Sequence, residues 1–379
     1  MLKRTRSFLV LVMLLMTVTM SAQVTTATMS GKVTAQDEPI IGATIVAIHE
    51  PSGTRYGTVT NVSGQFNLQG MRTGGPYKVE ISYVGYQTAI YKGINLLLGE
   101  NYVLNVSLKE SSELLDEVVV TASKESNMKS DRAGAIMNAN RDMISNTPTI
   151  SRSISDIMRL SPQGADVGNG FAVGGGNYRQ SFVTVDGAAF NNTFGLGGNL
   201  PANGSPISLD ALEQVTVAVT PFDVRQSGFT GGAINAVTRS GDNQFRGTAY
   251  MYFNNENLKG SKVDDYELLR SKAQYYTYGA SFGGPIIKDK LFFFVNGEYE
   301  DNVTAGSNYR PRTALGESYS GGNIHRPLQS DMDDMRGFLL NKYNFDPGKY
   351  NDYSTDTPAY RVMARVDWNA NQNNKVSFR

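Results

Sequence analysis

The sequence predicts a mainly β protein with an N-terminal β-sandwich, then an α/β domain, then antiparallel strands of the transmembrane kind. Composition gives the first reason, since the 379 residues include 39 Gly, 20 Tyr and 17 Phe but only 18% charged residues. Such a chain suits strands joined by turns better than a helical core. The second reason is a long period-two alternation of apolar and polar residues in the last third of the chain. Both features favour an architecture of many strands.

The side chains that most often carry chemistry are scarce. There is no Cys, and the only imidazoles belong to His49 and His325. Thiol chemistry, disulfide bonds and Cys-based zinc sites are therefore excluded, and neither a multi-His metal site nor a Ser-His-Asp triad can be argued. The 35 basic and 35 acidic residues balance, so charge gives no reason to expect a nucleic acid partner. We expect a protein that is not an enzyme and has no cofactor.

Residues 1–22 have the pattern of a secretory signal peptide. Lys3, Arg4 and Arg6 form a positive start, and an almost purely apolar run follows from Phe8 to Met20. This run has the length of a signal's apolar region and is too short for a bilayer-spanning helix. We therefore expect the chain to be exported. The alternative is that this segment is a membrane anchor.

Residues 24–109 are expected to form the β-sandwich. Short runs of strand-forming residues recur at close spacing, separated by turn signals such as Pro51-Ser52-Gly53 and Gly74-Gly75-Pro76. About seven strands in this length fit a sandwich. The expected strands are Ser30–Thr34, Ala43–His49, Gly57–Asn61, Gly64–Leu68, Tyr77–Val84, Thr88–Tyr91 and Tyr102–Leu108.

Residues 110–149 are expected to be a linker, because the composition changes sharply. A charged stretch ends at Asp116-Glu117, and the run Val118-Val119-Val120-Thr121-Ala122 follows it. A short β-branched run flanked by charge can lie extended and add to the sheet edge of another protein. The alternative is that Val118–Val120 is simply a strand of the next domain.

Residues 150–241 are expected to form a compact α/β domain. Ser153 and Asp156 have the spacing of a capping box, and Ile154, Ile157 and Met158 would share one face of the short helix that follows. Gly-rich loops separate three candidate strands. These strands are Phe182–Asp186, Val215–Thr220 and Ala233–Thr238.

Residues 245–379 have the pattern of transmembrane β-strands, in which apolar and polar residues alternate over about ten residues. In one run, Tyr360, Val362, Ala364, Val366 and Trp368 alternate with Arg361, Met363, Arg365, Asp367 and Asn369. The polar stretches 255–272 and 301–358 would be extracellular loops, and 284–290 a periplasmic turn. A soluble antiparallel sheet is the alternative. An open sheet leaves backbone groups unpaired in lipid, so we expect this stretch to be the incomplete start of a closed barrel.

The first domain carries four motifs in order. They are Gly31-Lys32-Val33, the segment from Pro39 to Ile45, the segment from Thr58 to Phe66, and the segment from Val79 to Tyr86. These motifs resemble the carboxypeptidase regulatory-like domain, which has a transthyretin-like sandwich. The resemblance implies an accessory module without catalytic groups. Because such domains are sometimes grouped with carbohydrate-binding-like folds, sugar binding is an alternative role.

Further motifs follow in order along the rest of the chain. They are Phe182-Val183-Thr184-Val185-Asp186-Gly187 and the segments Ser208–Val217, Gly231–Gly241 and Gly283–Phe294. Together they resemble TonB-dependent outer-membrane receptors of the Oar-like subgroup. The resemblance implies that residues 150–241 are a plug inside the barrel and that residues 116–122 are the TonB box, which a TonB-type energy-coupling protein grips. It also implies an outer-membrane location in a Gram-negative bacterium, with the N-terminal domain in the periplasm.

The function that the resemblance implies is active uptake of a nutrient across the outer membrane. The implied partners are the energy-coupling protein, outer-membrane lipid and an unknown extracellular substrate, with a surface lipoprotein as a further candidate. The candidate plug residues are Asp186, Gly187, Glu213, Arg225, Gly231, Gly232 and Arg239. The alternative function is an outer-membrane adhesion or scaffold protein that binds carbohydrate or protein through its sandwich and loops.

Overall fold

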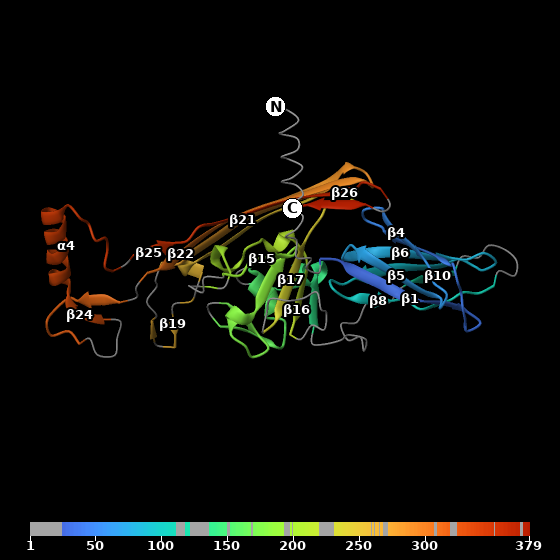
Figure 1. Cartoon of the computed structure of the whole chain (residues 1–379). Coiled ribbons are helices and arrows are strands. Elements are labelled where there is room, and N and C mark those ends of the chain that lie inside the picture. The colour runs from blue at the N-terminus through green and yellow to red at the C-terminus, as the bar shows by residue number, and fades with distance from the viewer. Residues whose placement is uncertain are drawn as a thin grey trace, which may run out of the picture. The chain divides into compact units, whose positions relative to one another are not determined.

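The computed structural model of the chain is mainly β, which confirms the predicted fold class (Figure 1). It describes residues 25–110, 118–121, 136–149, 152–167, 170–192, 198, 200–219, 231–258, 260, 262–264, 266–267, 272–306, 309–318, 324–351, 353–371 and 374–379. The expected signal peptide, residues 1–22, lies outside these ranges. The chain divides into two compact units, one of residues 1–247, 281–296 and 363–379, and one of residues 248–280 and 297–362.

The N-terminal domain is a sandwich of two sheets, as its strand spacing predicts. The first sheet has the order β2-β1-β5, with β8 and β9 also on β1, and the second has the order β10-β7-β6-β3-β4. The strands of the first sheet are β1 (Ala27–Ala35), β2 (Glu38–Pro39), β5 (Gln65–Met71), β8 (Asn101–Val103) and β9 (Val106–Ser107). Those of the second are β3 (Thr44–His49), β4 (Thr54–Val59), β6 (Gly74–Ser82), β7 (Ala89–Leu96) and β10 (Val118–Thr121).

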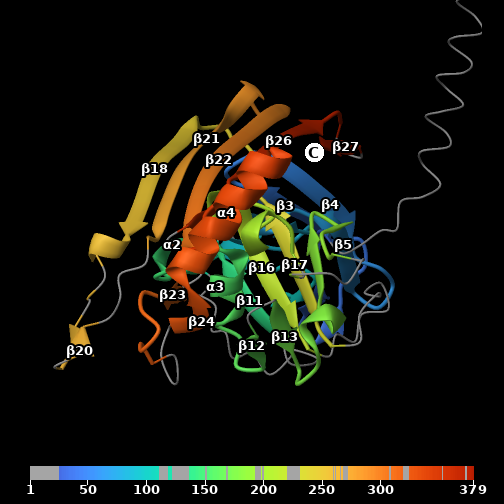
Figure 2. The same cartoon turned by 90° about the vertical axis from the view of Figure 1, so that its left-hand side faces the viewer.

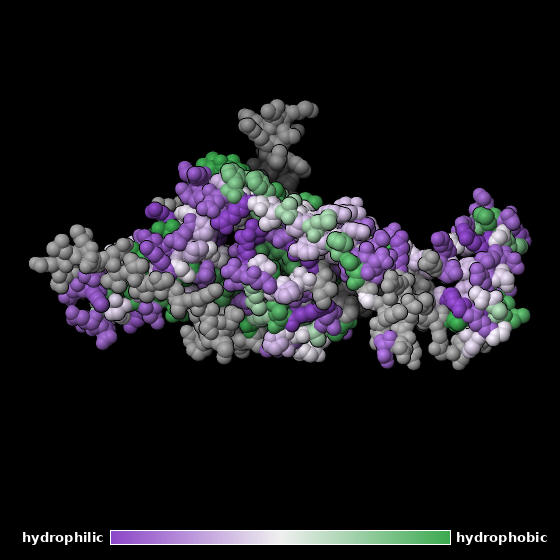
Figure 3. All heavy atoms as spheres, turned by 180° about the vertical axis from the view of Figure 1, so that it is seen from behind, coloured by the Kyte–Doolittle hydropathy of each residue, from purple (hydrophilic) through white to green (hydrophobic). Residues whose placement is uncertain are grey.

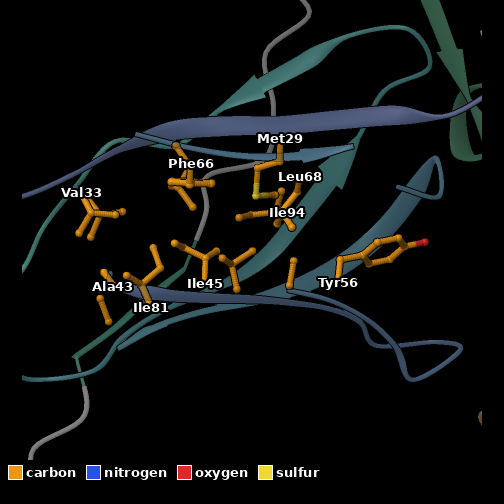
Figure 4. Packing of buried hydrophobic residues seen from close by; sticks show 14 of the residues in the cluster. Met29, Val33, Ala43, Ile45, Tyr56, Phe66, Leu68, Ile81 and Ile94 are labelled. Atoms are coloured by element: carbon orange, nitrogen blue, oxygen red, sulfur yellow. The ribbon is translucent and has the colours of Figure 1, made fainter. Parts of the chain in front are cut away.

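The sandwich is held together by apolar side chains that alternate strand residues direct between the two sheets. Met29 and Phe66 from the first sheet face Ile45 and Ile81 from the second (Figure 4). All four side chains are buried. Burial of apolar surface contributes roughly 25 cal/mol per Å², so this core provides the main stabilisation of the domain. The period-two pattern in the sequence therefore sets which face of each strand is inside.

We call residues 136–241 the middle domain; its five-stranded sheet has the order β11-β16-β17-β14-β15. Ser153 caps its second helix and forms the predicted capping box with Asp156. The strands β14 and β17 run parallel, so their carboxyl ends lie at the same edge of the sheet. The elements are β11 (Ile136–Asn140), α2 (Arg141–Asn146), α3 (Ile154–Met158), β12 (Gly164–Asp166), β13 (Phe171–Val173), η2 (Tyr178–Gln180), β14 (Phe182–Val185), β15 (Ala188–Ala189), η3 (Ala202–Gly204), η4 (Leu209–Ala211), β16 (Leu212–Ala218) and β17 (Ala233–Thr238).

The last part of the predicted linker differs from expectation, because residues 136–146 form β11 and α2. β11 pairs with β16 in the sheet of the middle domain. Its sequence resembles a linker because Asn138 is polar, but that side chain is buried. The Asn138 amide donates to Glu100 Oε1 at 2.7 Å and its oxygen accepts from the Thr216 hydroxyl. Satisfied hydrogen bonds therefore allow a polar residue inside this strand.

We call the strands that follow the middle domain the C-terminal sheet, which has the order β18-β21-β22-β26-β27 (Figure 2). The predicted alternation is present on β26, where Tyr360 and Val362 are 74% and 87% exposed, whereas Arg361 between them is 4% exposed. Hydrophobic residues lie at the top of the space-filling view, where Figure 1 places β26 (Figure 3). The strands are β18 (Arg246–Asn255), β21 (Gln274–Ile287), β22 (Leu291–Ala305), β26 (Ala359–Asn369) and β27 (Lys375–Phe378).

The two stretches expected to be loops hold short elements as well. Residues 301–358 include the helix α4, which the polar composition did not predict. Among the described residues, no helix has the length and apolar character needed to cross a membrane. The remaining elements are η5 (Glu256–Leu258), β19 (Lys262–Val263), β20 (Tyr266–Glu267), β23 (Arg310–Arg312), β24 (Ile324–Leu328), α4 (Gln329–Tyr343) and β25 (Ser354–Asp356).

Candidate functional site

The first candidate site lies where β14 and β17 of the middle domain end. Asp186 follows β14 with a φ of 50°, and Gly187 continues the turn with a φ of 87°. The Asp186 carboxylate accepts a hydrogen bond from the backbone N–H of Thr238 at 3.0 Å and another from the Thr238 hydroxyl. Arg379 Nη1 lies 3.3 Å from Asp186 Oδ1. Asp186 therefore joins the ends of two strands of the middle domain to the residue that follows β27.

A second arginine connects the C-terminal sheet to the end of β17. Arg365 on β26 donates from Nη1 to the Thr238 carbonyl oxygen at 2.6 Å. Its Nε lies 2.8 Å from Asp367 Oδ2, and Arg72 Nη2 lies 3.0 Å from that same oxygen. Arg72 belongs to the segment between β5 and β6 of the sandwich. We call Arg72, Asp186, Thr238, Arg365 and Asp367 the junction cluster, because its contacts connect the sandwich, the middle domain and the C-terminal sheet.

The electrostatics of the junction cluster depend on burial. The side chains of Arg365 and Asp367 are 6% and 8% exposed. A buried charge is costly unless it is paired and hydrogen-bonded, and removing one partner of such a pair typically costs about 3–5 kcal/mol. Ser377 adds a hydrogen bond from its hydroxyl to Asp367 Oδ1 at 2.6 Å. The cluster is therefore a set of mutually dependent contacts that would be lost or reformed together.

Arg239 and Glu213, both predicted as plug residues, lie elsewhere in the middle domain. The guanidinium carbon of Arg239 lies 4.9 Å from the ring centroid of Phe294 on β22, and Nη1 donates to the Asp210 carbonyl oxygen at 3.0 Å. Burial lowers the pKa of Arg239 to about 10, so the group still carries its charge at neutral pH. Burial raises the pKa of Glu213, and the charges of Arg141 and Arg239 oppose that rise. Arg239 therefore contacts the C-terminal sheet through an aromatic face.

Gly231 and Gly232, two of the candidate plug residues, pack closely against other residues of the middle domain. A Cβ atom at Gly232 would lie 2.5 Å from Cγ1 of Val173, which is on β13. A Cβ atom at Gly231 would lie 3.3 Å from Cβ of Gln180. Real Cβ atoms do not approach so closely at Gly232, so a larger residue there would displace β13. Gly232 is therefore a packing position of the middle domain.

The described residues of the predicted TonB box, Val118–Thr121, pair with the sandwich and not with the sheet of the middle domain, which was the alternative for Val118–Val120. Val118–Thr121 form β10, which pairs with β7 of the sandwich in parallel orientation. Asp116, Glu117 and Ala122 lie outside the described residues, as does Arg225. The segment is thus an added strand on a sheet edge, and the sheet belongs to this same chain.

Four residues of the junction cluster were not among the predicted site residues, and one of them, Thr238, was placed only as the end of an expected strand. Arg365 and Asp367 occupy the polar positions of the alternating run on β26, so the alternation itself could have identified them as inward-facing charges. Arg72 gave no such signal, because it stands alone in a short connection between strands. Its ion-pair partner, Asp367, is about 300 residues away in the sequence, and only the fold brings the two together.

A second cluster of buried charges lies on β22 and β26. Arg361 Nη1 is 2.8 Å from Glu298 Oε1, and Arg361 Nη2 is 2.6 Å from Glu300 Oε2. These side chains are 3%, 2% and 6% exposed, respectively. The Tyr250 hydroxyl also lies at 2.5 Å from Glu298 Oε2. We call Glu298, Glu300 and Arg361 the strand triad; it links two neighbouring strands of the C-terminal sheet. Across the described part of the chain, no group of three or more metal-binding side chains is positioned to hold an ion.

Two family models match this chain. The model described as a carboxypeptidase regulatory-like domain matches residues 28–109, and the model described as an outer membrane beta barrel domain matches residues 237–379. The first match covers the sandwich, and the second covers the end of β17 and the whole C-terminal sheet. Both agree with the resemblances predicted from the motifs.

Two curated relatives are similar to a large part of the chain. The TonB-dependent transporter Oar of Myxococcus xanthus is 27% identical over 235 residues, which are 60% of this chain and 20% of the relative. The TonB-dependent receptor SusC of Bacteroides thetaiotaomicron is 29% identical over 269 residues, which are 67% of this chain and 24% of the relative. The matched region thus spans about a fifth to a quarter of the length of these relatives.

Solved structures of outer-membrane receptors are similar as well. The siderophore receptor PirA from Acinetobacter baumannii has a TM-score of 0.41 and 16% identity, covering 62% of this chain and 29% of that chain. The outer membrane transporter YddB from Escherichia coli has a TM-score of 0.44 and 13% identity, covering 62% of this chain and 31% of that chain.

Proposed function

Because the chain is a homologue of TonB-dependent transporters and belongs to the outer membrane of a Gram-negative bacterium, we propose that it serves the active uptake of a nutrient. Its homologues are transporters and receptors, and not enzymes. In this proposal the C-terminal sheet is part of a barrel wall in lipid, the middle domain is the plug within that wall, and the sandwich lies in the periplasm. Residues 116–122 are the TonB box.

The observation that carries this proposal is the junction cluster. The contacts between the middle domain and the C-terminal sheet at this point are hydrogen bonds and ion pairs, formed by Asp186, Thr238, Arg365 and Arg379. A wide barrel needs material in its lumen if it is not to be an open channel. Polar contacts at the boundary suit a plug that is displaced and reseated, since water can replace each hydrogen bond while the plug is away.

In the proposed transport cycle, the steps follow a defined order. A substrate binds at the extracellular face, and a TonB-type protein of the inner membrane pulls on residues 116–122 from the periplasm. Tension then reaches the middle domain along the chain and breaks the contacts at the junction cluster. A surface lipoprotein that delivers the substrate is a further candidate partner, and lipid surrounds the apolar face of the strands.

Deletion of residues 116–122 from the full-length protein tests the proposal. In this variant, growth that depends on the receptor and on the proton-motive force should fall at least tenfold, because the coupling protein loses its attachment. A deletion of residues 124–130 is the matched control, since it shortens the same connection by the same length and leaves the box intact. Cross-linking to the energy-coupling protein should disappear only in the first variant.

The alternative role, adhesion or scaffolding through the sandwich and loops, leads to a different result. An adhesion protein does not use energy from the inner membrane, so both deletions would leave cell attachment unchanged. Normal energised growth after loss of residues 116–122 would refute the transport proposal.

A further inference from the structure

The strand β10 is held on the edge of the sandwich by a defined register. Val118 pairs with Ala89, Val119 with Ile90, Val120 with Tyr91, and Thr121 with Lys92, in parallel orientation. The pairing ends beside Gly93, whose φ of 79° turns the backbone of β7 away from a regular strand. The edge of β7 thus offers a binding length of four residues, and β10 fills it.

The opposite edge of β7 is already paired with another strand, so a further strand can add only at the edge where β10 lies. β7 pairs with β6, and Ala89 and Ile90 are buried. Without β10, the backbone N–H and C=O groups along this edge of β7 would have no strand partner in the described sheet order β10-β7-β6-β3-β4. An unpaired edge is a ready template for strand addition.

We propose that the β7 edge of the sandwich is the docking site of the coupling segment and that undocking of β10 is a step of energised transport. This inference rests on the proposed function, in which Val118–Thr121 are part of the segment that is pulled. The sandwich then holds that segment at rest, at a fixed place.

The order of events follows from the strength of the pairings. Only residues 122–135 connect β10 to β11, where the middle domain begins. While β10 is docked, tension on it is carried by β7 and not by that connection. Four residue pairs hold β10, whereas six pairs join β16 to β17, and both of those strands are almost fully buried. The docked strand therefore yields before the middle domain does, and force reaches the middle domain only after undocking.

Engineered disulfides in the full-length protein test the inference, because these 379 residues contain no Cys. Thr121→Cys with Lys92→Cys joins paired positions on adjacent strands, which lie about 4.8 Å apart and within the span of a disulfide. Val118→Cys with Lys92→Cys is the matched control. Its two positions are offset by three residues, roughly 10 Å along the strands, which is too far for a disulfide. Lys92 is exposed, so its replacement leaves the sandwich core intact.

We expect the in-register pair to cross-link in intact cells under oxidising conditions and the offset pair to remain reduced. The cross-linked receptor should lose proton-motive-force-dependent growth at least tenfold, and a reductant should restore it. Equal cross-linking of both pairs would overturn the docking register. Full activity of the cross-linked receptor would overturn the undocking step.

The two proposals fail in different ways. If the in-register cross-link forms but deletion of residues 116–122 leaves energised growth unchanged, the proposed function and the undocking step are wrong, whereas docking of β10 on β7 stands. If that deletion abolishes growth but the in-register pair never cross-links, the proposed function stands and the docking site is wrong.

Discussion

At the scale of single residues, His49 shows how burial sets the pH dependence of the sandwich. Its ring lies 5.0 Å from the ring of Tyr77, and its Nδ1 is 2.7 Å from the Ser52 hydroxyl. Ser52 Oγ is in turn 2.7 Å from Thr54 Oγ1. Burial, aided by the charge of Arg72, lowers the pKa of His49 to about 3. The folded sandwich therefore holds this imidazole neutral over the whole physiological range.

His49 should make the sandwich less stable in acid. The unfolded chain binds a proton at His49 below a pH of about 6.5, whereas the folded chain does so only near pH 3. Stability is thus fully present above pH 6.5 and falls by about 1.4 kcal/mol per pH unit below it, so about 2–3 kcal/mol is lost by pH 4.5. Amide hydrogen exchange of β3 and β6 in the full-length protein measures this loss.

Two matched variants distinguish the effect of the His49 imidazole on acid stability from the effect of other titrating groups. His49→Gln keeps a polar side chain but cannot titrate in this range, so the loss between pH 6.5 and 4.5 should shrink by most of that amount. His325→Gln removes the other, exposed imidazole and should leave the profile unchanged. An unaltered acid slope in His49→Gln would show that carboxylates and not His49 control it.

At the residue scale, Asp186-Gly187 was singled out because it resembles the family motif of an apolar strand that ends in Asp-Gly. In the structure both residues form a turn with positive φ angles. Arg72 could not be found, because nothing in its neighbourhood distinguishes it from a solvated charge. Its role depends on Asp367, which reaches it only when the sandwich and β26 have both folded.

At the scale of elements, two of the strands expected in the middle domain lie close to the observed ones. The expected Ala233–Thr238 is β17 with the same bounds, and the expected Phe182–Asp186 is β14 with one residue fewer. β11 and α4 were missed for opposite reasons. β11 contains a buried polar side chain, Asn138, that tertiary hydrogen bonds satisfy, and α4 has no buried residue, so its sequence lacks an apolar stripe.

The buried ion pairs of the strand triad, which link β22 to β26, should contribute strongly to stability. Arg361→Met would leave Glu298 and Glu300 buried close to each other without a cation, so we expect a loss of about 3–5 kcal/mol in unfolding free energy. Adding Glu298→Gln and Glu300→Gln should recover much of the loss, because no buried charge remains. Thermal unfolding of the detergent-solubilised full-length protein measures each step.

Arg336 provides the comparison for the strand triad. It pairs with Asp346 at 2.8 Å, but the two side chains are 41% and 49% exposed. Exposed ion pairs contribute little to stability because water screens them, so Arg336→Met should hardly change the unfolding temperature. Equal effects of Arg336→Met and Arg361→Met would contradict the claim that burial determines the value of these pairs.

At the scale of the whole molecule, we expect removal of the sandwich and removal of the middle domain to have different consequences. The sandwich and the middle domain have different hydrophobic cores, the second of which includes Phe294 of β22, whereas the strands of the C-terminal sheet expose other apolar side chains. A domain with its own core can be deleted without removing the core of the other. Deleting each of these two domains in turn therefore distinguishes a domain that fills the barrel from one that does not.

Deleting residues 136–241 from the full-length protein should turn the transporter into an open pore, because a wide barrel without a plug leaves an aqueous channel. Cells with this variant should become at least tenfold more sensitive to a large hydrophilic antibiotic that the intact outer membrane excludes. Deleting residues 28–109 is the control: under the proposed arrangement it removes the periplasmic sandwich and leaves the lumen filled, so sensitivity should not change. Equal sensitivity of both variants, with both present in the outer membrane at wild-type levels, would mean that the middle domain does not occlude the barrel.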